Sequence, residues 1–466
     1  MTTKPILGIT VLGDFILSEG PDAIIANLRR VGASAVGCNP TVTAPADEVT
    51  GSFQPPLDAG SSPRLFDRPL FGQHSLWLRS GPSYKPRNEF YAGVKYGPRK
   101  TNDLTTQHGQ VIGEFIQKAG DAGLKVYLQL GAVQPTGLHD ADRPRLPNGN
   151  LPTNRLADTG SLASPDIRDY NRAYVRDLVA AYPQIAGFRI DWPEYPCYTL
   201  GELFQDFSTH VANWAESHSF NFELARRDVG ALYDHLLSGR LTDSELEKFA
   251  SPDQQHFQLF TSLIERPGVL EWLRLKAALS VDLVRDWREA IQDASEGRME
   301  LTSHAFMMPW SILTGLDFRR VGELSDSVSP KFYTMHWPLM IQFWGTPIRE
   351  ANPHINERIL TQALVTLADL ADPGEIHDSL SDYYYPEPDE PHPISESVQL
   401  RKLNQIRSAL CGTRTHLVPL VHGYGPDDDF ARRLALVASS DVDGVWINRY
   451  GYLGAAKLEA IGELQW

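Results

Sequence analysis

The chain has 466 residues, of which 42% are hydrophobic and 22% are charged, and this composition is typical of a globular protein with a large core. Its formal net charge of −15 argues against a nucleic-acid partner, because nucleic-acid binding needs Lys and Arg to neutralise phosphates. The three cysteines, Cys38, Cys197 and Cys411, are far apart and form no CxxC pair, so a disulfide framework is not predicted.

The N-terminal residues do not have the pattern of a secretion signal. They lack a basic start followed by a long apolar run and a small-residue cleavage site, and no later segment approaches 18 uninterrupted apolar residues. We therefore expect a cytoplasmic protein with no membrane partner. We also expect neither a cofactor nor a resident metal.

Short apolar segments recur along the chain, and most of them are followed by a helix-like pattern. This alternation predicts a parallel sheet covered by helices. Because there are eight such segments, we predict a (β/α)8 TIM barrel rather than an open sheet. The predicted strands are 6–11, 33–39, 125–133, 185–191, 299–306, 329–337, 415–421 and 444–450.

Three of the intervening helices are clear in the sequence. Apolar residues recur at helical spacing in 21–32 and in 111–125. A third helix is predicted over 164–183, where Ser164 is a suitable N-cap and Pro165 follows at the first helical position. This helix leads directly into the predicted fourth strand.

Three connections are too long for ordinary barrel loops, and long connections tend to be functional or to contain structure of their own. Residues 40–104 are rich in Pro, Gly and aromatic residues, which suggests a lid or wall. Residues 200–296 contain amphipathic stretches that predict a helical insertion. Residues 376–395 are acidic, Tyr-rich and broken by prolines, so we expect an exposed loop or, alternatively, tyrosines that line a cleft. We interpret 1–466 as a single barrel domain with these insertions.

The most informative segment is AGFRIDWPEYP at 186–196, a short apolar strand that ends in Asp191, Trp192 and Glu194. Alternate side chains of a strand share a face, so Arg189 and Asp191 point to the same side. Two charges are costly to bury unless they pair. The segment therefore indicates either a functional site or a structural pair of Arg189 and Asp191 that closes the strand.

In a (β/α)8 barrel the active site forms at the carboxyl ends of the strands. The ends of the fourth to eighth predicted strands all carry polar or aromatic residues that would meet at one mouth. The alternative is that the histidines are structural and that the tryptophans pack the barrel rim. We predict a substrate-binding set of Arg189, Trp192, His304, Trp310, Tyr333, His336, Trp337, His422, Tyr424, Asn448 and Arg449.

Two carboxylates beside a cleft are what glycosidic bond cleavage requires, one to protonate the leaving oxygen and one to attack, to stabilise charge or to activate water. Asp191 and Glu194 are the predicted catalytic pair. Glu194 needs a pKa raised by burial to act as the acid, whereas Asp191 beside Arg189 is expected to stay ionised. Lower-ranked acids near strand ends are Asp14, Asp140, Glu202, Asp317 and Asp427.

The same residues resemble known families. The end of AGFRIDWPEYP resembles the DWEYP fourth-strand motif of the chitinase-type glycoside hydrolases, with Pro193 inserted before Glu194. GFRID is also similar to the fourth strand of the α-amylase family, in which the Asp is the nucleophile and the Arg supports it. The run 164–196 resembles most closely the uncharacterised glycoside-hydrolase-like barrels, in which a helix that begins SPD or NPD precedes a strand that ends D-x-x-x-YP. These resemblances imply a sugar-active TIM barrel with a carbohydrate substrate and with Asp191 in the catalytic centre.

Two other functions fit the sequence. One is a metal-dependent sugar isomerase, epimerase or hydrolase that uses His304, His336 and His422 with a carboxylate, since imidazole and carboxylate together suit Zn or Mn. No HxH or HxxxH pair lies near the strand ends, which leaves single ligands from separate strands. The other is a carbohydrate-binding barrel without catalysis. Chelator sensitivity would identify the first, and oligosaccharide binding without turnover would identify the second.

Overall fold

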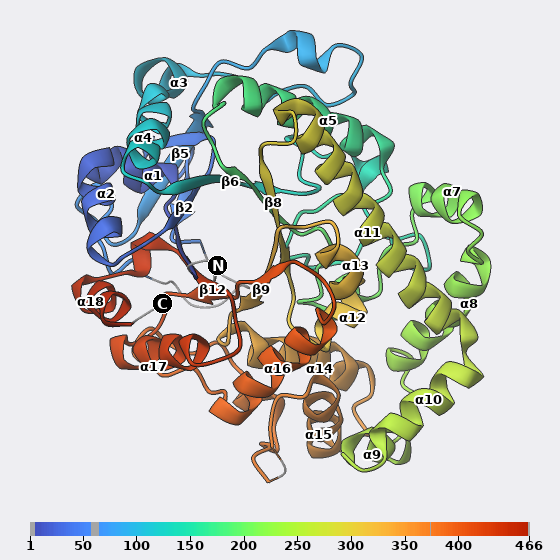
Figure 1. Cartoon of the computed structure of the whole chain (residues 1–466). Coiled ribbons are helices and arrows are strands. Elements are labelled where there is room, and N and C mark those ends of the chain that lie inside the picture. The colour runs from blue at the N-terminus through green and yellow to red at the C-terminus, as the bar shows by residue number, and fades with distance from the viewer. Residues whose placement is uncertain (1–4, 57–64, 373, 465–466) are drawn as a thin grey trace.

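The computed structural model describes residues 5–56, 65–372 and 374–464. Its parallel strands close into an eight-stranded barrel, in which one of the eight strands is interrupted. Each strand pairs with its neighbours around the ring, and the last strand pairs with the first (Figure 1). The predicted (β/α)8 barrel and its eight strands are therefore confirmed. The strands are β1 (Ile6–Thr10), β2 (Ala35–Cys38), β6 (Lys125–Gly131), β7 (Gly187–Asp191), β8 (Glu300–Ala305), β9 (Ser327–Phe332), β10 (His416–Leu417) with β11 (Leu420–His422), and β12 (Gly444–Asn448).

Two strands differ from the sequence prediction in their extent. The seventh position is divided into β10 and β11, because Pro419 between them has no N–H to donate to the neighbouring strand. The sixth strand ends at Phe332 rather than continuing to residue 337. The chain turns there, with the His336 N–H donating to the Tyr333 carbonyl, and His336 begins a helix.

Helices surround the barrel on its outside (Figure 1). The three helices predicted from the sequence are present as α2 (Pro21–Arg30), α4 (Gln110–Asp121) and α5 (Pro165–Ala181). Ser164 caps α5 as expected, since its hydroxyl accepts from the Ile167 N–H at 3.3 Å. Other helices that follow strands are α1 (Gly13–Glu19), α12 (Trp310–Thr314), α13 (Phe318–Gly322), α14 (His336–Ala351), α15 (Glu357–Ala368), α16 (Glu396–Ala409), α17 (Asp427–Ala438) and α18 (Ala455–Glu463).

The first long connection is not a simple loop. Its described part forms a three-stranded antiparallel sheet of β3 (Thr41–Pro45), β5 (Leu76–Pro82) and β4 (Ser52–Gln54) in that order, followed by a short 3-10 helix, η2 (Asn88–Tyr91). Helix α3 (Asp103–His108) then leads back to the barrel. The carboxyl end of β2 thus continues into a separate small sheet beside the barrel.

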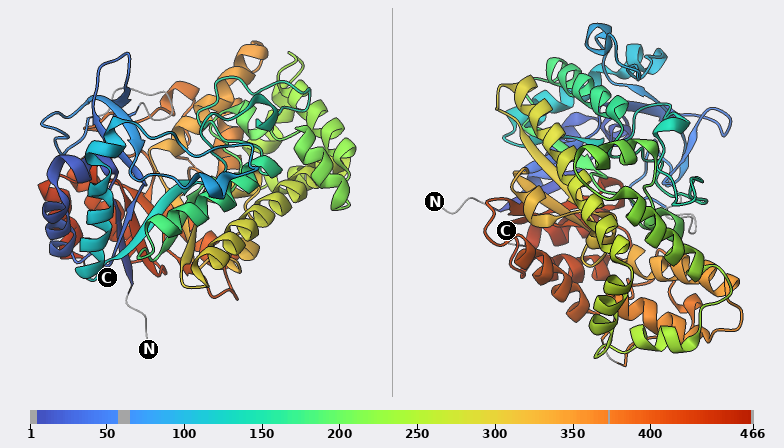
Figure 2. Two further views of the ribbon diagram at one scale, coloured as in Figure 1. Left: turned by 90° about the horizontal axis from the view of Figure 1, so that it is seen from above. Right: turned by 90° about the vertical axis from the view of Figure 1, so that its right-hand side faces the viewer.

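The second long connection is helical. It contains α6 (Leu200–Leu203), α7 (Thr209–Ser217), α8 (Phe222–Leu236), α9 (Asp243–Ala250), α10 (Gln255–Glu265) and the long α11 (Pro267–Ser295). Helices α7 to α10 project from one side of the barrel, while α11 runs back along α5 to the fifth strand (Figures 1 and 2).

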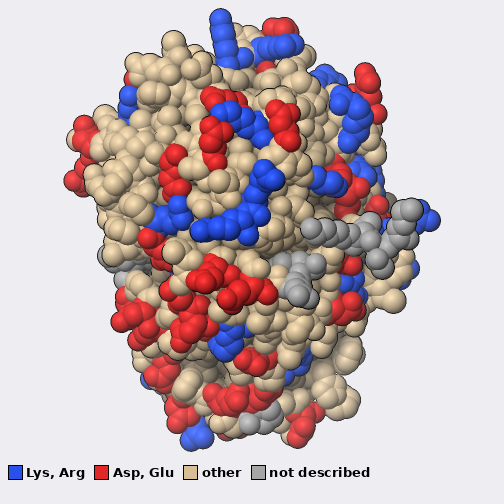
Figure 3. Space-filling view, turned by 60° about the vertical axis from the view of Figure 1, so that its left-hand side comes forward, with Lys and Arg blue, Asp and Glu red and all other residues tan. Residues whose placement is uncertain are grey.

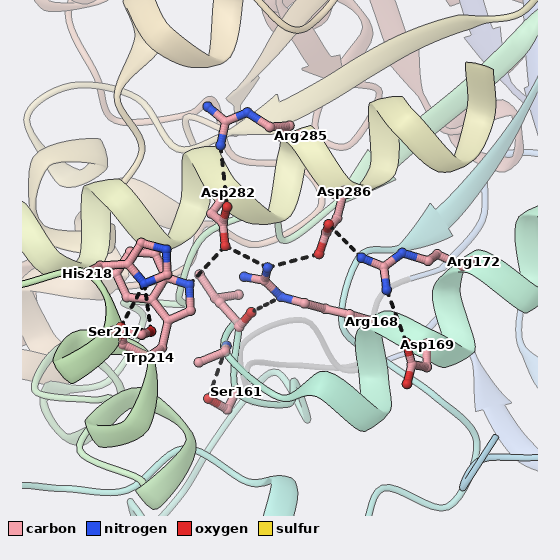
Figure 4. A network of polar contacts seen from close by, with 12 residues as sticks. Ser161, Arg168, Asp169, Arg172, Trp214, Ser217, His218, Asp282, Arg285 and Asp286 are labelled. Atoms are coloured by element: carbon pink, nitrogen blue, oxygen red, sulfur yellow. Dashed lines mark hydrogen bonds and ion pairs between the residues drawn. The ribbon is translucent and has the colours of Figure 1, made fainter. Parts of the chain in front are cut away.

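Ion pairs join this insertion to the barrel. Arg168 on α5 places Nη1 at 2.7 Å from Asp282 and at 2.9 Å from Asp286, both on α11 (Figure 4). Asp282 also accepts from the indole N–H of Trp214 on α7 at 2.9 Å. Arg172, one turn along α5, pairs with Asp286 at 2.8 Å. The network therefore connects three helices that are far apart in the sequence.

The third long connection differs from the exposed loop that the sequence favoured. Apart from a 3-10 turn, η4 (Leu380–Asp382), its described residues form neither helix nor strand, yet Tyr383, Tyr385 and His392 are buried. The His392 ring contacts the Thr334 hydroxyl at 2.7 Å, just beyond the end of β9. The aromatic residues of this segment therefore pack against the carboxyl end of the barrel.

Large side chains fill the inside of the barrel. The guanidinium of Arg189 lies 3.6 Å from the centre of the Trp446 ring, and both residues are buried. Glycine occurs where these side chains cross neighbouring strands. A Cβ at Gly8 would lie 2.3 Å from the Trp446 ring, and one at Gly37 would lie 2.8 Å from Arg189. The barrel is therefore a packed core, and its function has to be sought at one end.

The outer surface agrees with the acidic composition. Figure 3 shows acidic side chains gathered over the lower half of one face, with a smaller basic group above them. Among the helices of the described residues, none combines the length and apolar character needed to cross a lipid bilayer.

Candidate active site

Three strand ends bring a carboxyl group, a lysine and a histidine together at the carboxyl end of the barrel. Asp191 ends β7, and its Oδ1 is 2.7 Å from Nζ of Lys331 on β9. Nδ1 of His304 on β8 is 3.5 Å from the same oxygen. The side chain of Asp191 remains 24% exposed, whereas His304 and Lys331 are buried. Asp191 is therefore the member of this group that solvent can reach.

The neighbours of Asp191 fix its charge. Burial alone raises the pKa of Asp191, but the ammonium of Lys331 and the contact with His304 outweigh it and hold that pKa well below its usual range. The pKa of His304 is also lowered, to about 4, by burial and by the charge of Arg189. A lowered pKa favours the charged form of a carboxyl group but the neutral form of an imidazole. At neutral pH Asp191 is thus a carboxylate and His304 a neutral imidazole.

Lys331 was not identified from the sequence. Its Nζ lies 3.4 Å from the centre of the Trp192 ring and 5.0 Å from that of Phe306, so the ammonium is held between a carboxylate and two aromatic faces. All six residues of β9 are buried, and a lysine in such a strand needs a partner. A lysine within a predicted apolar strand is the signal in the sequence that could have identified this residue.

Arg189 is not the partner of Asp191, contrary to the expectation that the two would pair. Its Nη1 donates to Thr10 Oγ1 and to Gln129 Oε1, each at 3.1 Å, and its guanidinium stacks on Trp446. Burial lowers the pKa of Arg189 to about 9. With no exposed surface, Arg189 lies in the packing beneath the mouth rather than on its surface.

The backbone turns sharply after Asp191. Trp192 has φ 62°, a left-handed conformation that is uncommon for a bulky residue and that often marks functional sites. The Trp192 N–H donates to Asp191 Oδ1 at 3.0 Å, and the Pro193 carbonyl accepts from Ser280 on α11 at 2.7 Å. The turn thus places the indole over Lys331 and directs the following residues inward.

Glu194 lies at the inner end of this turn and is 1% exposed. Its Oε1 accepts from the Phe306 N–H at 2.5 Å, and its Oε2 contacts the hydroxyl of Thr314. That hydroxyl also donates to the Ser311 carbonyl at 3.1 Å. Burial raises the pKa of Glu194 to about 7 despite these hydrogen bonds and the nearby Lys331. The Thr314 hydroxyl donates to Oε2, and this hydrogen bond and that from the Phe306 N–H oppose the effect of burial on the pKa.

Aromatic rings surround the Asp191 group on one side. Trp192, Tyr198 and Phe306 contact one another edge to face, with ring centres 5.4 to 5.7 Å apart. Tyr198 in turn lies 5.5 Å from His336. Neither Tyr198 nor Phe306 belonged to the predicted set: Tyr198 lies beyond the end of the fourth strand, and from the end of the fifth predicted strand the set contains His304 rather than Phe306.

On the other side, the predicted residues of the last three strand ends are adjacent. The Tyr333 ring lies 5.4 Å from His336 and 5.1 Å from His422, and its hydroxyl accepts from the Asn448 amide at 2.9 Å. Tyr424 donates its backbone N–H to Nδ1 of His422 at 3.0 Å. The structure therefore brings these five predicted residues together.

The two predicted tryptophans lie deeper in the structure. Trp310 and Trp337 are 1% and 3% exposed, and their ring centres are 5.7 Å apart. The ammonium of Lys402 lies 4.5 Å from the Trp310 ring. Both tryptophans thus form part of the packing behind the mouth.

The lower-ranked acids have mostly structural surroundings. Glu202 and Asp317 accept backbone N–H groups at the starts of α6 and α13, Asp140 pairs with Arg145 at 2.6 Å, and Asp427 begins α17. Asp14 differs from them. It follows β1 and is buried, and burial raises its pKa to about 6 although the charge of Arg449 lowers it. Asp14 is therefore a buried acid near the mouth whose pKa is influenced by the half-buried Arg449.

The metal alternative requires the three histidines to converge. His304 contacts Asp191, whereas His336 and His422 lie on either side of Tyr333. Within residues 5–56, 65–372 and 374–464, no group of three or more His, Cys, Asp or Glu side chains is arranged to hold a metal ion. The predicted histidines are thus separate contacts of the mouth rather than one ligand set.

Comparison with known proteins identifies the fold but no family. No family model matches the chain, and no curated protein sequence matches it. Among solved structures, a β-galactosidase from the psychrophilic Marinomonas ef1 is 12% identical with a TM-score of 0.52, covering 98% of this chain and 58% of its own. This chain thus spans little more than half the length of that enzyme.

Other solved structures are less similar. The catalytic domain of a β-amylase from Paenibacillus polymyxa has a TM-score of 0.47 at 8% identity, covering 97% of this chain and 94% of its own. A chitinase from Chromobacterium violaceum has a TM-score of 0.40 at 8% identity, covering 99% and 100%. The structural neighbours named here are glycoside hydrolases. What this chain shares with the Marinomonas enzyme is its fold, the closed barrel of eight parallel strands surrounded by helices.

Proposed function

We propose that the protein is a glycoside hydrolase that acts on an oligosaccharide or a glycoside. The observation that carries this proposal is the different surroundings of two carboxyl groups at the end of β7, one beside an ammonium and partly exposed, the other buried. Asp191 is ionised, while Glu194, three residues later, has a pKa of about 7. A pair of carboxyl groups whose surroundings separate their pKa values in this way supplies one base or nucleophile and one acid.

In this mechanism Asp191 provides the negative charge. Within the described part of the chain, Lys331, His304 and the Trp192 N–H all contact Oδ1. Oδ2 is therefore left to face the anomeric carbon, where it attacks the sugar, stabilises its developing positive charge or activates water. Lys331 keeps the carboxylate ionised even when a substrate displaces water from it.

Glu194 is the proposed general acid. Below a pH of about 7 it carries a proton, and its Oε2 lies in contact with Thr314. We propose that this proton passes to the leaving oxygen when the substrate takes the place of Thr314 as its partner. The aromatic rings of Trp192, Tyr198 and Phe306 exclude water from this step and offer flat faces to the sugar.

The experiment is a survey of aryl glycosides with the wild type and with two variants, Asp191→Asn and Glu194→Gln. We expect the wild type to cleave at least one substrate and each variant to lose that activity while its circular dichroism spectrum is unchanged. Full activity in both variants would show that the catalytic assignment is wrong. Oligosaccharide binding without turnover, unchanged in Asp191→Asn, would instead identify a carbohydrate-binding barrel.

A further inference from the structure

A second cavity lies at the same end of the barrel, one strand away from Asp191. It has a volume of about 220 Å³ and lies between the ends of β2 and β6, the residues that follow β5, and helix α5. This volume is below the roughly 300–1,000 Å³ of sites that hold drug-sized ligands, so it suits a single ring. Its lining includes the side chains of Tyr84, Arg99, Gln129, Gln134, Tyr170 and Tyr174.

The cavity joins the candidate active site through the barrel strands. Gly131, which lines the cavity on β6, is the register partner of Asp191 on β7, and Gln129 is that of Arg189. The Gln134 side chain packs directly against Gly131, where a Cβ would lie 2.1 Å from its Oε1, so glycine at this position lets Gln134 reach the cavity wall. A sugar ring in the cavity would therefore be adjacent to a ring bound over Asp191.

The walls of the cavity are suited to a sugar ring. Tyr170 and Tyr174, one turn apart on α5, are stacked with ring centres 5.4 Å apart and an interplanar angle of 25°. They form an aromatic surface of the kind against which the apolar face of a pyranose packs. Gln129 and Gln134 also line the cavity, and the side-chain amide of Gln129, whose Oε1 accepts from Arg189, can donate its N–H to a hydroxyl.

The charge of the cavity is unusual for this protein. None of its lining residues is acidic, although the whole chain has 58 acidic residues against 43 Lys and Arg. Arg99 donates to the Ser80 hydroxyl at 2.6 Å, and none of the ion pairs found among the described residues involves Arg99. Asp177 lies behind the wall, where its carboxylate accepts from Tyr84, Tyr91 and the Arg87 N–H. Among the residues that the structure describes, the guanidinium of Arg99 thus has no acidic partner.

We propose that this cavity is a subsite for a sugar that carries an anionic group, a carboxylate or a sulfate, paired with Arg99. The inference rests on the proposed function, since it makes the substrate an anionic oligosaccharide whose neighbouring ring is cleaved at Asp191. An arginine without an acidic partner recognises such a group by two parallel charge-assisted hydrogen bonds. A neutral sugar would leave the guanidinium unpaired.

The test measures binding rather than turnover. Glucuronate, glucose 6-sulfate and glucose are titrated into the full-length Asp191→Asn variant, and affinity is followed by ligand-observed NMR. We expect at least one of the two anionic sugars to bind on the order of tenfold or more tightly than glucose. The stronger of the two identifies the anionic group. Addition of Arg99→Met should abolish this preference.

Arg87→Met is the matched control, because Arg87 is an exposed arginine of the same segment that does not line the cavity. It should leave the preference unchanged, and thermal unfolding should show that both arginine variants are folded. Equal binding of all three sugars, no binding of either anionic sugar, or an unchanged preference in Arg99→Met would each overturn the proposal. Because binding is measured without catalysis, inactivity of the wild type on every glycoside would count against the hydrolase and not against the subsite.

Discussion

Two ion-pair groups in this molecule use the same side-chain chemistry in different settings. Between α5 and α11, Arg168 contacts Asp282 and Asp286, and both carboxylates have further donors on their remaining oxygens. At the barrel mouth, the contacts of Asp191 described above are all made with Oδ1. In the first group both oxygens of each carboxylate have protein donors, whereas the contacts described for the second involve one oxygen of Asp191.

The two groups also differ in their surroundings. The helix pairs lie on the outside of the barrel between helices, and their role is to hold the insertion in place (Figure 4). The Asp191 group lies at the ends of three strands among aromatic rings, where the effective dielectric constant is lower and charges interact more strongly. We therefore expect an ion pair in this fold to be structural where protein donors contact both carboxylate oxygens, and functional where one oxygen is available to a ligand.

The largest expected effect is that of Asp191→Asn. If Oδ2 of Asp191 carries the chemistry, its neutral amide should lower kcat by about 10² to 10⁴-fold on any cleaved glycoside. Asp286→Asn is the matched control in the helix group, and it should keep kcat within about twofold because it removes only a structural contact. Steady-state kinetics of both variants checks the comparison. Similar activity losses in both would show that the two groups do not differ in role.

Glu194→Gln should have the next largest effect, a loss of roughly 10²-fold in kcat. An acid with a pKa of about 7 is protonated below that pH, so the wild-type activity should fall as pH rises through about 7. The control is Glu202→Gln, since burial also raises the pKa of Glu202, which caps a helix. We expect Glu202→Gln to retain the alkaline limb of the pH profile. An unchanged alkaline limb in a residually active Glu194→Gln would assign the limb to another group.

Lys331→Met should change the acid limb of the pH profile rather than abolish activity. Lys331 lowers the pKa of Asp191, so its removal should raise that pKa by about one to three units, and activity should be lost at a correspondingly higher pH. The same depressed pKa stabilises the fold above the ordinary pKa of Asp, and this contribution is lost as pH falls through the folded value. Lys331→Arg retains the charge and should keep the acid limb near its original position. If the acid limb does not move in Lys331→Met, the ionisation of Asp191 is not the cause of that limb.

The barrel itself was predictable because its strands are short apolar segments that alternate with amphipathic helices. The error at 329–337 has a physical cause, since buried aromatic residues are equally compatible with a strand and with the start of α14. The small antiparallel sheet after β2 was missed because its Pro, Gly and aromatic residues are also typical of loops.

The candidate site was predictable only in part. Asp191 and Glu194 share one short segment, so its strand end and its resemblance to known fourth-strand motifs were enough to propose them as candidates. Lys331 reaches Asp191 across the intervening strand β8, and no local pattern in the sequence indicates that contact. Arg99 and the tyrosines of the second cavity likewise come from separate segments, which only the folded barrel brings together.

The smallest expected effect on activity is that of Arg168→Met, which tests the other half of the comparison. Loss of its ion pairs with α11 should lower the free energy of unfolding by about 1 to 3 kcal/mol, because hydrogen bonds to charged groups are removed while the aliphatic packing is largely kept. Its kcat should stay within about twofold of the wild type, because the helix group has no part in the chemistry. Urea unfolding and steady-state kinetics on the same preparation measure both quantities. A large loss of kcat in folded Arg168→Met would mean that the helical insertion positions the barrel mouth, so that the structural and functional ion pairs act together.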